Sequence, residues 1–120
     1  TKFESLKEDL KKILIKFEEV LNLEKIEINR DSAIQRFEIA VDLARKTLKS
    51  YLGENKGIIC KSPKLLTFSQ GTIDYDEYWI EIVDFRNQTA YIYNEEFANK
   101  IYNEFPKILK YLKQLFEKLK

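Results

Sequence analysis

The sequence contains no histidine, no methionine and only one cysteine, three glycines and two prolines among its 120 residues. Because histidine is absent, the chain lacks the commonest general acid or base near neutral pH and the commonest metal ligand. The single cysteine, Cys60, excludes an internal disulfide, and so few glycines and prolines argue against an all-β fold with its many tight turns. No run of apolar residues is long enough to span a bilayer, so we expect no membrane partner.

Positive and negative charges are almost balanced, with 21 Lys and Arg residues against 20 Asp and Glu residues. The formal net charge of +1 gives no overall electrostatic attraction to nucleic acid. Apolar residues make up 44% of the chain and charged residues 34%, a composition that excludes a disordered polar tail. The length suits a single domain over residues 1–120. The lone cysteine and the absence of a charged-then-apolar leader predict a cytoplasmic protein.

Apolar residues recur at spacings of three and four along most of the chain, which is the pattern of amphipathic helices. The first predicted helix starts at Thr1–Glu4, which has the form of a capping box, and continues to about Leu21. The second helix is expected to begin at one of three residues that can cap a helix: Asn29, Asp31 or Ser32.

The second predicted helix ends at Gly53, a residue that suits the left-handed C-terminal position. Ser62-Pro63 predicts a short third helix, and the Asp74-x-x-Glu77 pattern predicts the start of a fourth. The last helix follows Asn94 and is expected to kink or restart at Pro106, which has no N–H to donate. The whole pattern predicts an all-α fold, an antiparallel up-and-down bundle of four to five helices.

Two helical segments carry more than the pattern of a bundle. The second helix contains Gln35-Arg36-Phe37-Glu38, and Trp79 is followed by Arg86-Asn87-Gln88-Thr89-Ala90-Tyr91-Ile92-Tyr93. With these landmarks in this order, the sequence resembles the nucleotidyltransferase substrate-binding proteins, a branch of the HEPN helical domains. The resemblance covers the chain from about Leu6 to Leu119.

The resemblance implies a small helical bundle that forms a homodimer and acts beside a minimal nucleotidyltransferase. The transferase carries the nucleotide chemistry, so ATP and Mg²⁺ are expected on that partner and no cofactor on this chain. In such pairs the HEPN protein often acts as a toxin and the transferase as its antitoxin. The expected function is therefore that of a non-catalytic partner, either a substrate-binding or a toxin component.

Many HEPN toxins are metal-independent RNases with an arginine followed, four to six residues later, by a histidine. In some of them a tyrosine two residues after that histidine receives adenylyl groups. By resemblance, Arg86 matches the arginine and Asn87 the asparagine beside it, whereas Tyr91 stands where histidine belongs and Tyr93 matches the modified tyrosine. The candidate catalytic residues are Arg86 and Tyr91, and the candidate binding residues are Arg36, Glu38, Trp79, Arg86, Asn87 and Tyr91.

Tyr91 weakens the RNase alternative. Free histidine titrates near pH 6.5 and tyrosine near pH 10, so a tyrosine base carries a handicap of roughly 4 kcal/mol at pH 7. The segment from Asp74 to Glu96 also holds seven acidic residues against one arginine, which disfavours RNA. An RNase toxin with a degenerate Arg-x4-Tyr motif stays the alternative to a non-catalytic partner.

Each of these residues also has a purely structural explanation. Arg86 can form an ion pair with the neighbouring Asp84 and Glu81, and Trp79 falls on the apolar stripe of its helix. The tyrosine pair at the end of the motif can pack with its hydroxyls at the surface.

Arg36 and Glu38 flank the buried position Phe37, which fits either a polar pocket at the bundle edge or a plain surface pair. Glu38, Asp42 and Lys46 are spaced four apart, as in ordinary pairing along a helix surface. Without histidine, these carboxylates do not form a di-iron motif, and we expect no metal.

Overall fold

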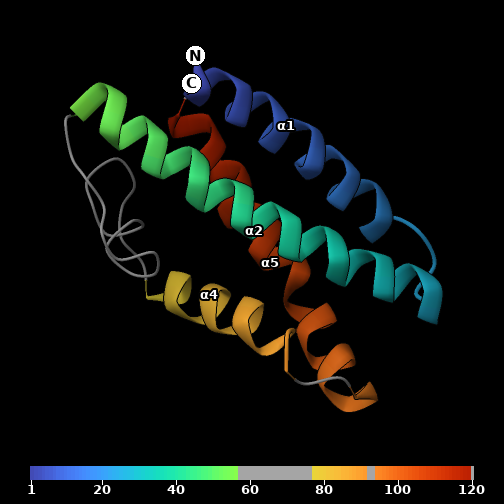
Figure 1. The fold of residues 1–120 in the computed structure, drawn as a ribbon. Coiled ribbons are helices and arrows are strands. Elements are labelled where there is room, and N and C mark those ends of the chain that lie inside the picture. The colour runs from blue at the N-terminus through green and yellow to red at the C-terminus, as the bar shows by residue number, and fades with distance from the viewer. Residues whose placement is uncertain (57–76, 92–93, 120) are drawn as a thin grey trace.

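The computed structural model describes residues 1–56, 77–91 and 94–119. Within these ranges the regular structure is entirely helical: α1 (Lys2–Leu21), α2 (Glu27–Lys56), α4 (Tyr78–Gln88) and α5 (Glu95–Lys118). Figure 1 shows that α1 and α2 run antiparallel, that α5 returns beside them and that α4 lies at the lower edge. The predicted all-α bundle is confirmed. The helix predicted at Ser62-Pro63 lies outside the described residues, as does Asp74.

Helix α1 begins as its sequence predicts. The Thr1 side chain accepts a hydrogen bond from the backbone N–H of Glu4, and the Glu4 side chain accepts one from Thr1, which completes the capping box. One face of the helix is buried and carries Leu10, Ile13, Leu14, Phe17 and Val20.

Helix α2 is longer at both ends than its sequence suggests. It begins at Glu27, two residues before Asn29, and the Arg30 N–H already donates to the Ile26 carbonyl oxygen at 2.8 Å. The Asn29 side chain donates to the Glu24 carbonyl oxygen at 2.9 Å. It ends at Lys56 rather than at Gly53, which lies inside the helix. A glycine in a helix interior costs only about 1 kcal/mol, so tertiary contacts can override it.

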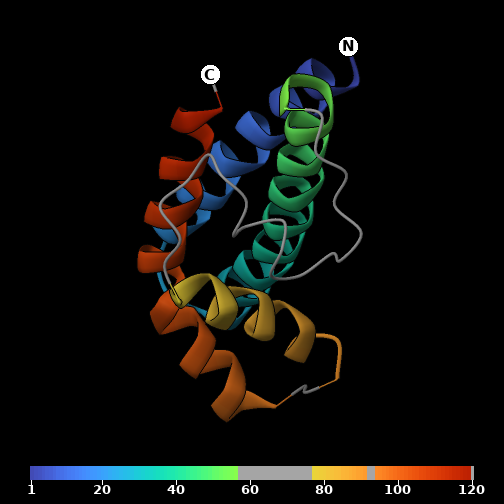
Figure 2. The same cartoon turned by 90° about the vertical axis from the view of Figure 1, so that its left-hand side faces the viewer.

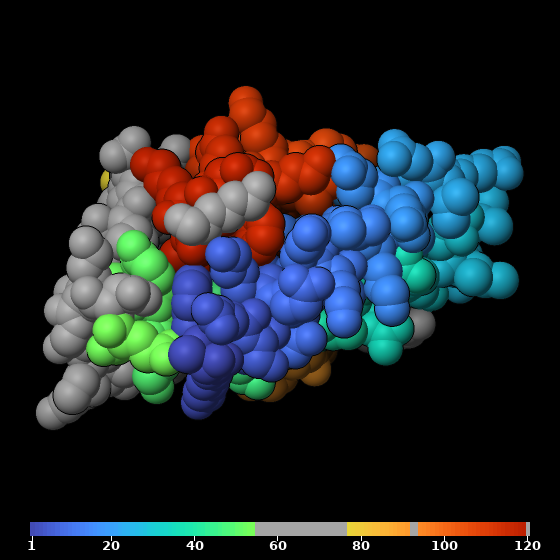
Figure 3. Space-filling view, turned by 90° about the horizontal axis from the view of Figure 1, so that it is seen from above, coloured from blue at the N-terminus to red at the C-terminus, as the bar shows by residue number. Residues whose placement is uncertain are grey.

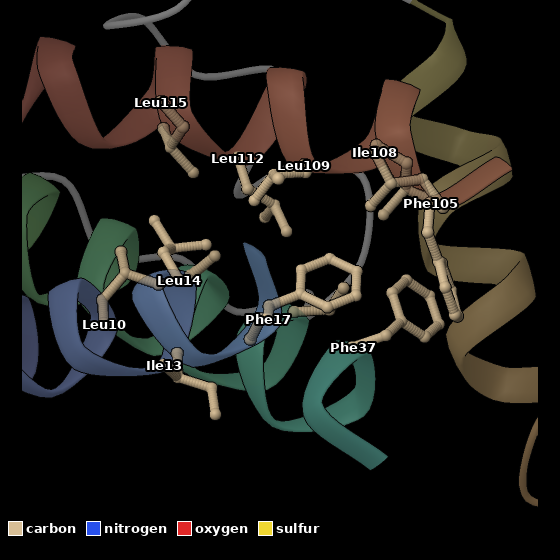
Figure 4. Packing of buried hydrophobic residues seen from close by; sticks show 14 of the residues in the cluster. Leu10, Ile13, Leu14, Phe17, Phe37, Phe105, Ile108, Leu109, Leu112 and Leu115 are labelled. Atoms are coloured by element: carbon tan, nitrogen blue, oxygen red, sulfur yellow. The ribbon is translucent and has the colours of Figure 1, made fainter. Parts of the chain in front are cut away.

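Three phenylalanine rings hold the three long helices together. Phe17 of α1, Phe37 of α2 and Phe105 of α5 are fully buried. The Phe105 ring centroid lies 5.2 Å from that of Phe17 and 5.1 Å from that of Phe37. Figure 4 shows the three rings converging below the leucines of α5. These distances are typical of favourable aromatic pairs, which add to the burial energy.

Pro106 lies inside α5, and the helix does not restart there. Figure 2 shows that the axis of α5 changes direction between its orange N-terminal part and its red C-terminal part. A proline removes one backbone hydrogen bond and crowds the preceding turn, which accounts for the bend. Before the bend Glu95 binds Arg30 at the start of α2, and after it the helix buries Ile108, Leu109, Leu112 and Leu115.

The start of α4 packs on the middle of α5. The Trp79 ring meets the Tyr111 ring edge-on at 5.8 Å, and the Tyr78 hydroxyl donates to Glu104 at 3.0 Å. Burial, reinforced by the Glu104 carboxylate, raises the pKa of Tyr78 above its ordinary value, so this hydroxyl stays protonated. Lys107 places its ammonium 4.0 Å from the centre of the Tyr78 ring.

The molecule is elongated, with principal extents of 44 × 23 × 21 Å. Figure 3 shows α1 and the C-terminal part of α5 side by side on one face, and Figure 1 shows the start of α1 and the end of α5 at the same end of the bundle. Among the described helices, none has a stretch long and apolar enough to cross a bilayer.

Candidate functional site

Arg86, in the last turn of α4, reaches across to α2 and binds two carboxylates. Its Nε and Nη2 atoms donate to the two oxygens of Asp42 at 3.1 and 2.9 Å, a bidentate pair. Its Nη1 donates to Glu38 at 3.1 Å. Thr89 lies 3.0 Å from the same Glu38 oxygen and 2.7 Å from the Arg86 carbonyl oxygen, two acceptors that share one hydroxyl proton. We call these four residues the α2–α4 clamp.

The clamp is possible because Glu38 and Asp42 are one turn apart on α2. Residues at this spacing lie on the same helix face, so both carboxylates point toward the end of α4. The hydrogen bonds to Asp42, followed by the charges of Asp42 and Glu38, raise the pKa of Arg86, although partial burial opposes them. Its positive charge is thus permanent and is offset by two negative ones.

Arg86 does form an ion pair, as its structural explanation proposed, but the predicted partners are wrong. Asp84 and Glu81 stand on the same helix as Arg86, yet the guanidinium binds acids of α2. Glu38 and Asp42 are likewise more than a surface pair, because they face α4. Within residues 1–56, 77–91 and 94–119, no group of His, Cys, Asp or Glu is arranged to hold a metal ion.

A pocket of about 260 Å³ opens beside the clamp, between the first half of α2, the end of α4 and the start of α5. We call it the α2–α5 pocket. Glu38 and Thr89 belong both to the clamp and to the pocket wall. The lining residues are Glu27, Arg30, Asp31, Ile34, Gln35, Glu38, Thr89, Asn94, Glu95, Phe97 and Ala98.

Arg30 forms the charged floor of this pocket and is only 6% exposed. Its guanidinium donates to Glu95 at 2.7 Å and to Asp31 at 3.2 Å, and a longer hydrogen bond of 3.4 Å reaches Asn99. The hydrogen bond with Glu95 raises the pKa of Arg30 and lowers the pKa of Glu95. The contact ties the start of α2 to the start of α5.

Sequence reasoning missed Arg30, although a signal was present. The residue stands two helical turns before Phe37, on the same buried face of α2, and a charged side chain on such a face needs a partner. The partner could not be named, because Glu95 is 65 residues away along the chain.

The other predicted residues separate into different parts of the molecule. Trp79 is 3% exposed and belongs to the core, as its structural explanation proposed. Arg36 donates to the Lys16 carbonyl oxygen of α1 at 2.6 Å and so faces away from the clamp. Asn87 is half-buried in the last turn of α4, and Tyr91 is 87% exposed in the turn that follows. Tyr93 lies outside the described residues.

The fold and the site define a small helical-bundle domain with an arginine clamp and a pocket along one side. A family model described as "Nucleotidyltransferase substrate binding protein like" matches residues 2–120. The chain therefore belongs to the family of nucleotidyltransferase substrate-binding-like proteins.

A solved structure supports the same fold. The chain is similar to a protein from Thermus thermophilus whose crystal structure is known, with a TM-score of 0.83 and 32% sequence identity. The similarity covers 92% of this chain and 98% of the other. A search among curated proteins finds no match.

Proposed function

We propose that this protein is the non-catalytic partner of a minimal nucleotidyltransferase and holds a substrate, or one of its own tyrosines, for nucleotidyl transfer. Family membership supports the first part. The α2–α4 clamp is the observation that carries the binding role. Its arginine is already bound by Glu38 and Asp42, whereas the pocket beside it is open to a substrate. In this pair the present chain binds the substrate and the transferase carries out the reaction.

The proposal places ATP and Mg²⁺ on the transferase. The α2–α5 pocket has carboxylates from both α2 and α5 in its wall, and negative walls repel the phosphates of a nucleotide. Two basic groups near it, Arg30 and Arg86, are already bound to carboxylates. These contacts favour binding of the acceptor here and of the nucleotide on the partner.

We also propose that this chain forms a homodimer in the cytoplasm. In its pair with the transferase, this HEPN-type chain is the substrate-binding component or the toxin, and the transferase is the antitoxin. Several large apolar side chains are exposed on the described surface and offer contacts for another chain. These are Ile15, Leu23, Ile26, Ile28, Ile39 and Tyr91.

Tyr93 is the proposed acceptor within this chain. In the reaction its phenolic oxygen attacks the α-phosphorus of ATP, pyrophosphate leaves and the phenolic proton passes to a base. With a cognate transferase, ATP and Mg²⁺, we expect mass spectrometry of the intact protein to show added AMP, which is absent from Tyr93→Phe. Tyr91→Phe is the matched control and keeps the modification. Equal labelling of Tyr93→Phe would remove Tyr93 from the proposal.

The RNase alternative requires Arg86 to stabilise charge on a scissile phosphate. In the clamp this guanidinium donates to two carboxylates, so a phosphate would have to compete with both. We expect the purified protein to leave tRNA intact on a denaturing gel. Cleavage that Arg86→Ala abolishes and Arg36→Ala preserves would replace the non-catalytic function by the RNase.

A further inference from the structure

The α2–α5 pocket combines a carboxylate-rich wall with an apolar one. Four carboxylates come from two helices, and three apolar side chains stand among them. The carboxylates belong to Glu27, Asp31, Glu38 and Glu95, and the apolar side chains to Ile34, Phe97 and Ala98. Such a mixed lining is typical of sites for small organic molecules, in which an apolar surface gives affinity and a few polar groups fix orientation.

The charges of the lining do not cancel. Among the described residues that line the pocket, Arg30 is the one basic side chain beside four carboxylates, and its guanidinium is shared between Asp31 and Glu95. Glu38 also binds Arg86, which does not line the pocket. The charge of Arg86 is shared with Asp42, which it binds bidentately. A concave surface with an excess of one sign focuses its field on the ligand, so the pocket attracts positive charge.

Two helix N-termini border the pocket, and helix N-termini by themselves favour anions. Here they are already complemented by the chain. In α5 the Asn94 side chain accepts from the Phe97 N–H at 2.8 Å, and Glu95 and Glu96 occupy the first turn. In α2 the first turn carries Glu27. The helix N-termini therefore do not cancel the negative charge of the pocket.

An organic cation fits this lining better than a metal ion. The carboxylates of the described chain are nowhere gathered as metal ligands, and in this pocket an apolar wall accompanies them. The volume of about 260 Å³ lies just below the roughly 300–1,000 Å³ of pockets for drug-sized ligands. This is room for a group the size of an amino acid or a single sugar ring.

We propose that the α2–α5 pocket binds a protonated amine carried by a small organic molecule, which would be the acceptor substrate of the partner transferase. The amine lies against Glu27, and the hydrocarbon part of the molecule covers Ile34 and Phe97. Glu38, three helical turns further along α2, adds to the negative field of the pocket wall. The role of this molecule as an acceptor depends on the function proposed above, whereas the binding of an amine depends only on the pocket.

The amine site can be tested on this chain alone with two ring compounds of the same shape, cyclohexylamine and cyclohexanol. In ¹H–¹⁵N NMR titrations at pH 7, we expect cyclohexylamine to shift the amide signals of Ile34, Phe97 and Ala98. Cyclohexanol should bind at least tenfold more weakly. Equal binding of the two compounds, or shifts confined to other parts of the chain, would overturn the proposal.

Variants test whether the carboxylates are responsible. Glu27→Gln with Glu38→Gln should weaken cyclohexylamine binding at least tenfold, whereas Glu19→Gln on α1, outside the pocket, should leave it unchanged. Glu38 also belongs to the clamp, so Glu27→Gln alone, at an exposed position, serves if the double variant unfolds. An unchanged affinity in Glu27→Gln with a folded spectrum would contradict the proposed contact.

The two proposals fail separately. If cyclohexylamine binds but no complex with a cognate transferase forms in size-exclusion chromatography, the amine site stands and the acceptor role is lost. If the complex forms but the amine does not bind, the partner function stands and the pocket assignment is wrong.

Discussion

Replacing Phe105 by alanine is expected to lower the free energy of unfolding by about 3–5 kcal/mol. The ring is fully buried and touches those of Phe17 and Phe37, so its removal leaves a cavity where all three long helices meet. Urea unfolding followed by far-UV circular dichroism measures the change. Because this loss is comparable to the stability of many small domains, Phe105→Leu provides a milder variant with a smaller expected loss.

The control for this substitution is Ile39→Ala. The Ile39 side chain is 41% exposed on α2, and its truncation is expected to change the unfolding free energy by no more than about 0.5 kcal/mol. An equally small loss of unfolding free energy in Phe105→Ala and Ile39→Ala would contradict the shared aromatic core of α1, α2 and α5.

Replacing Arg86 by alanine is expected to lower the free energy of unfolding by about 2–3 kcal/mol. The substitution removes three charge-assisted hydrogen bonds and leaves Glu38 and Asp42 facing each other without this cation. The three side chains are 23–36% exposed, so solvent reduces the loss below the roughly 3–5 kcal/mol typical of fully buried pairs. The same urea titration measures it.

A double-mutant cycle separates the clamp from a general effect of the substitution. In an Asp42→Asn background, Arg86→Ala should cost clearly less, because one of the two carboxylates that face Arg86 is already neutral. Arg36→Ala is the matched arginine control: its guanidinium makes an exposed hydrogen bond to a backbone carbonyl, and its removal should cost less than about 1 kcal/mol. Additive losses for Arg86 and Asp42 would show that they do not interact.

The α2–α5 pocket and the clamp share Glu38. Arg86 donates to the Glu38 carboxylate at 3.1 Å and so holds this part of the pocket wall in place. The clamp also fixes the end of α4, from which the turn with the exposed Tyr91 extends. A single set of contacts thereby orients the pocket and the segment that leads to the proposed acceptor tyrosine.

The helical elements could be predicted from local sequence because their causes are local. The capping box at Thr1–Glu4 and the apolar spacing of α1 act within one or two turns, and both predictions are confirmed. The burial of Trp79 followed from its place on an apolar stripe. The start of α2 was misplaced by a few residues: Asn29, a good capping residue, lies inside the helix, and its side chain donates to the Glu24 carbonyl oxygen.

The amino-acid order by itself determines the all-α class and the approximate positions of the described helices. It also shows that some polar residues are present which a bundle core does not need. Only the folded structure shows that Arg86 binds Asp42 and Glu38 rather than the acids on its own helix. It alone also shows that Arg30 binds Glu95. Helix periodicity states which face a residue occupies, but it does not state which helix lies opposite. Partners 44 and 65 positions apart along the chain are brought together by packing of the apolar faces, and the pocket exists only where those helices meet.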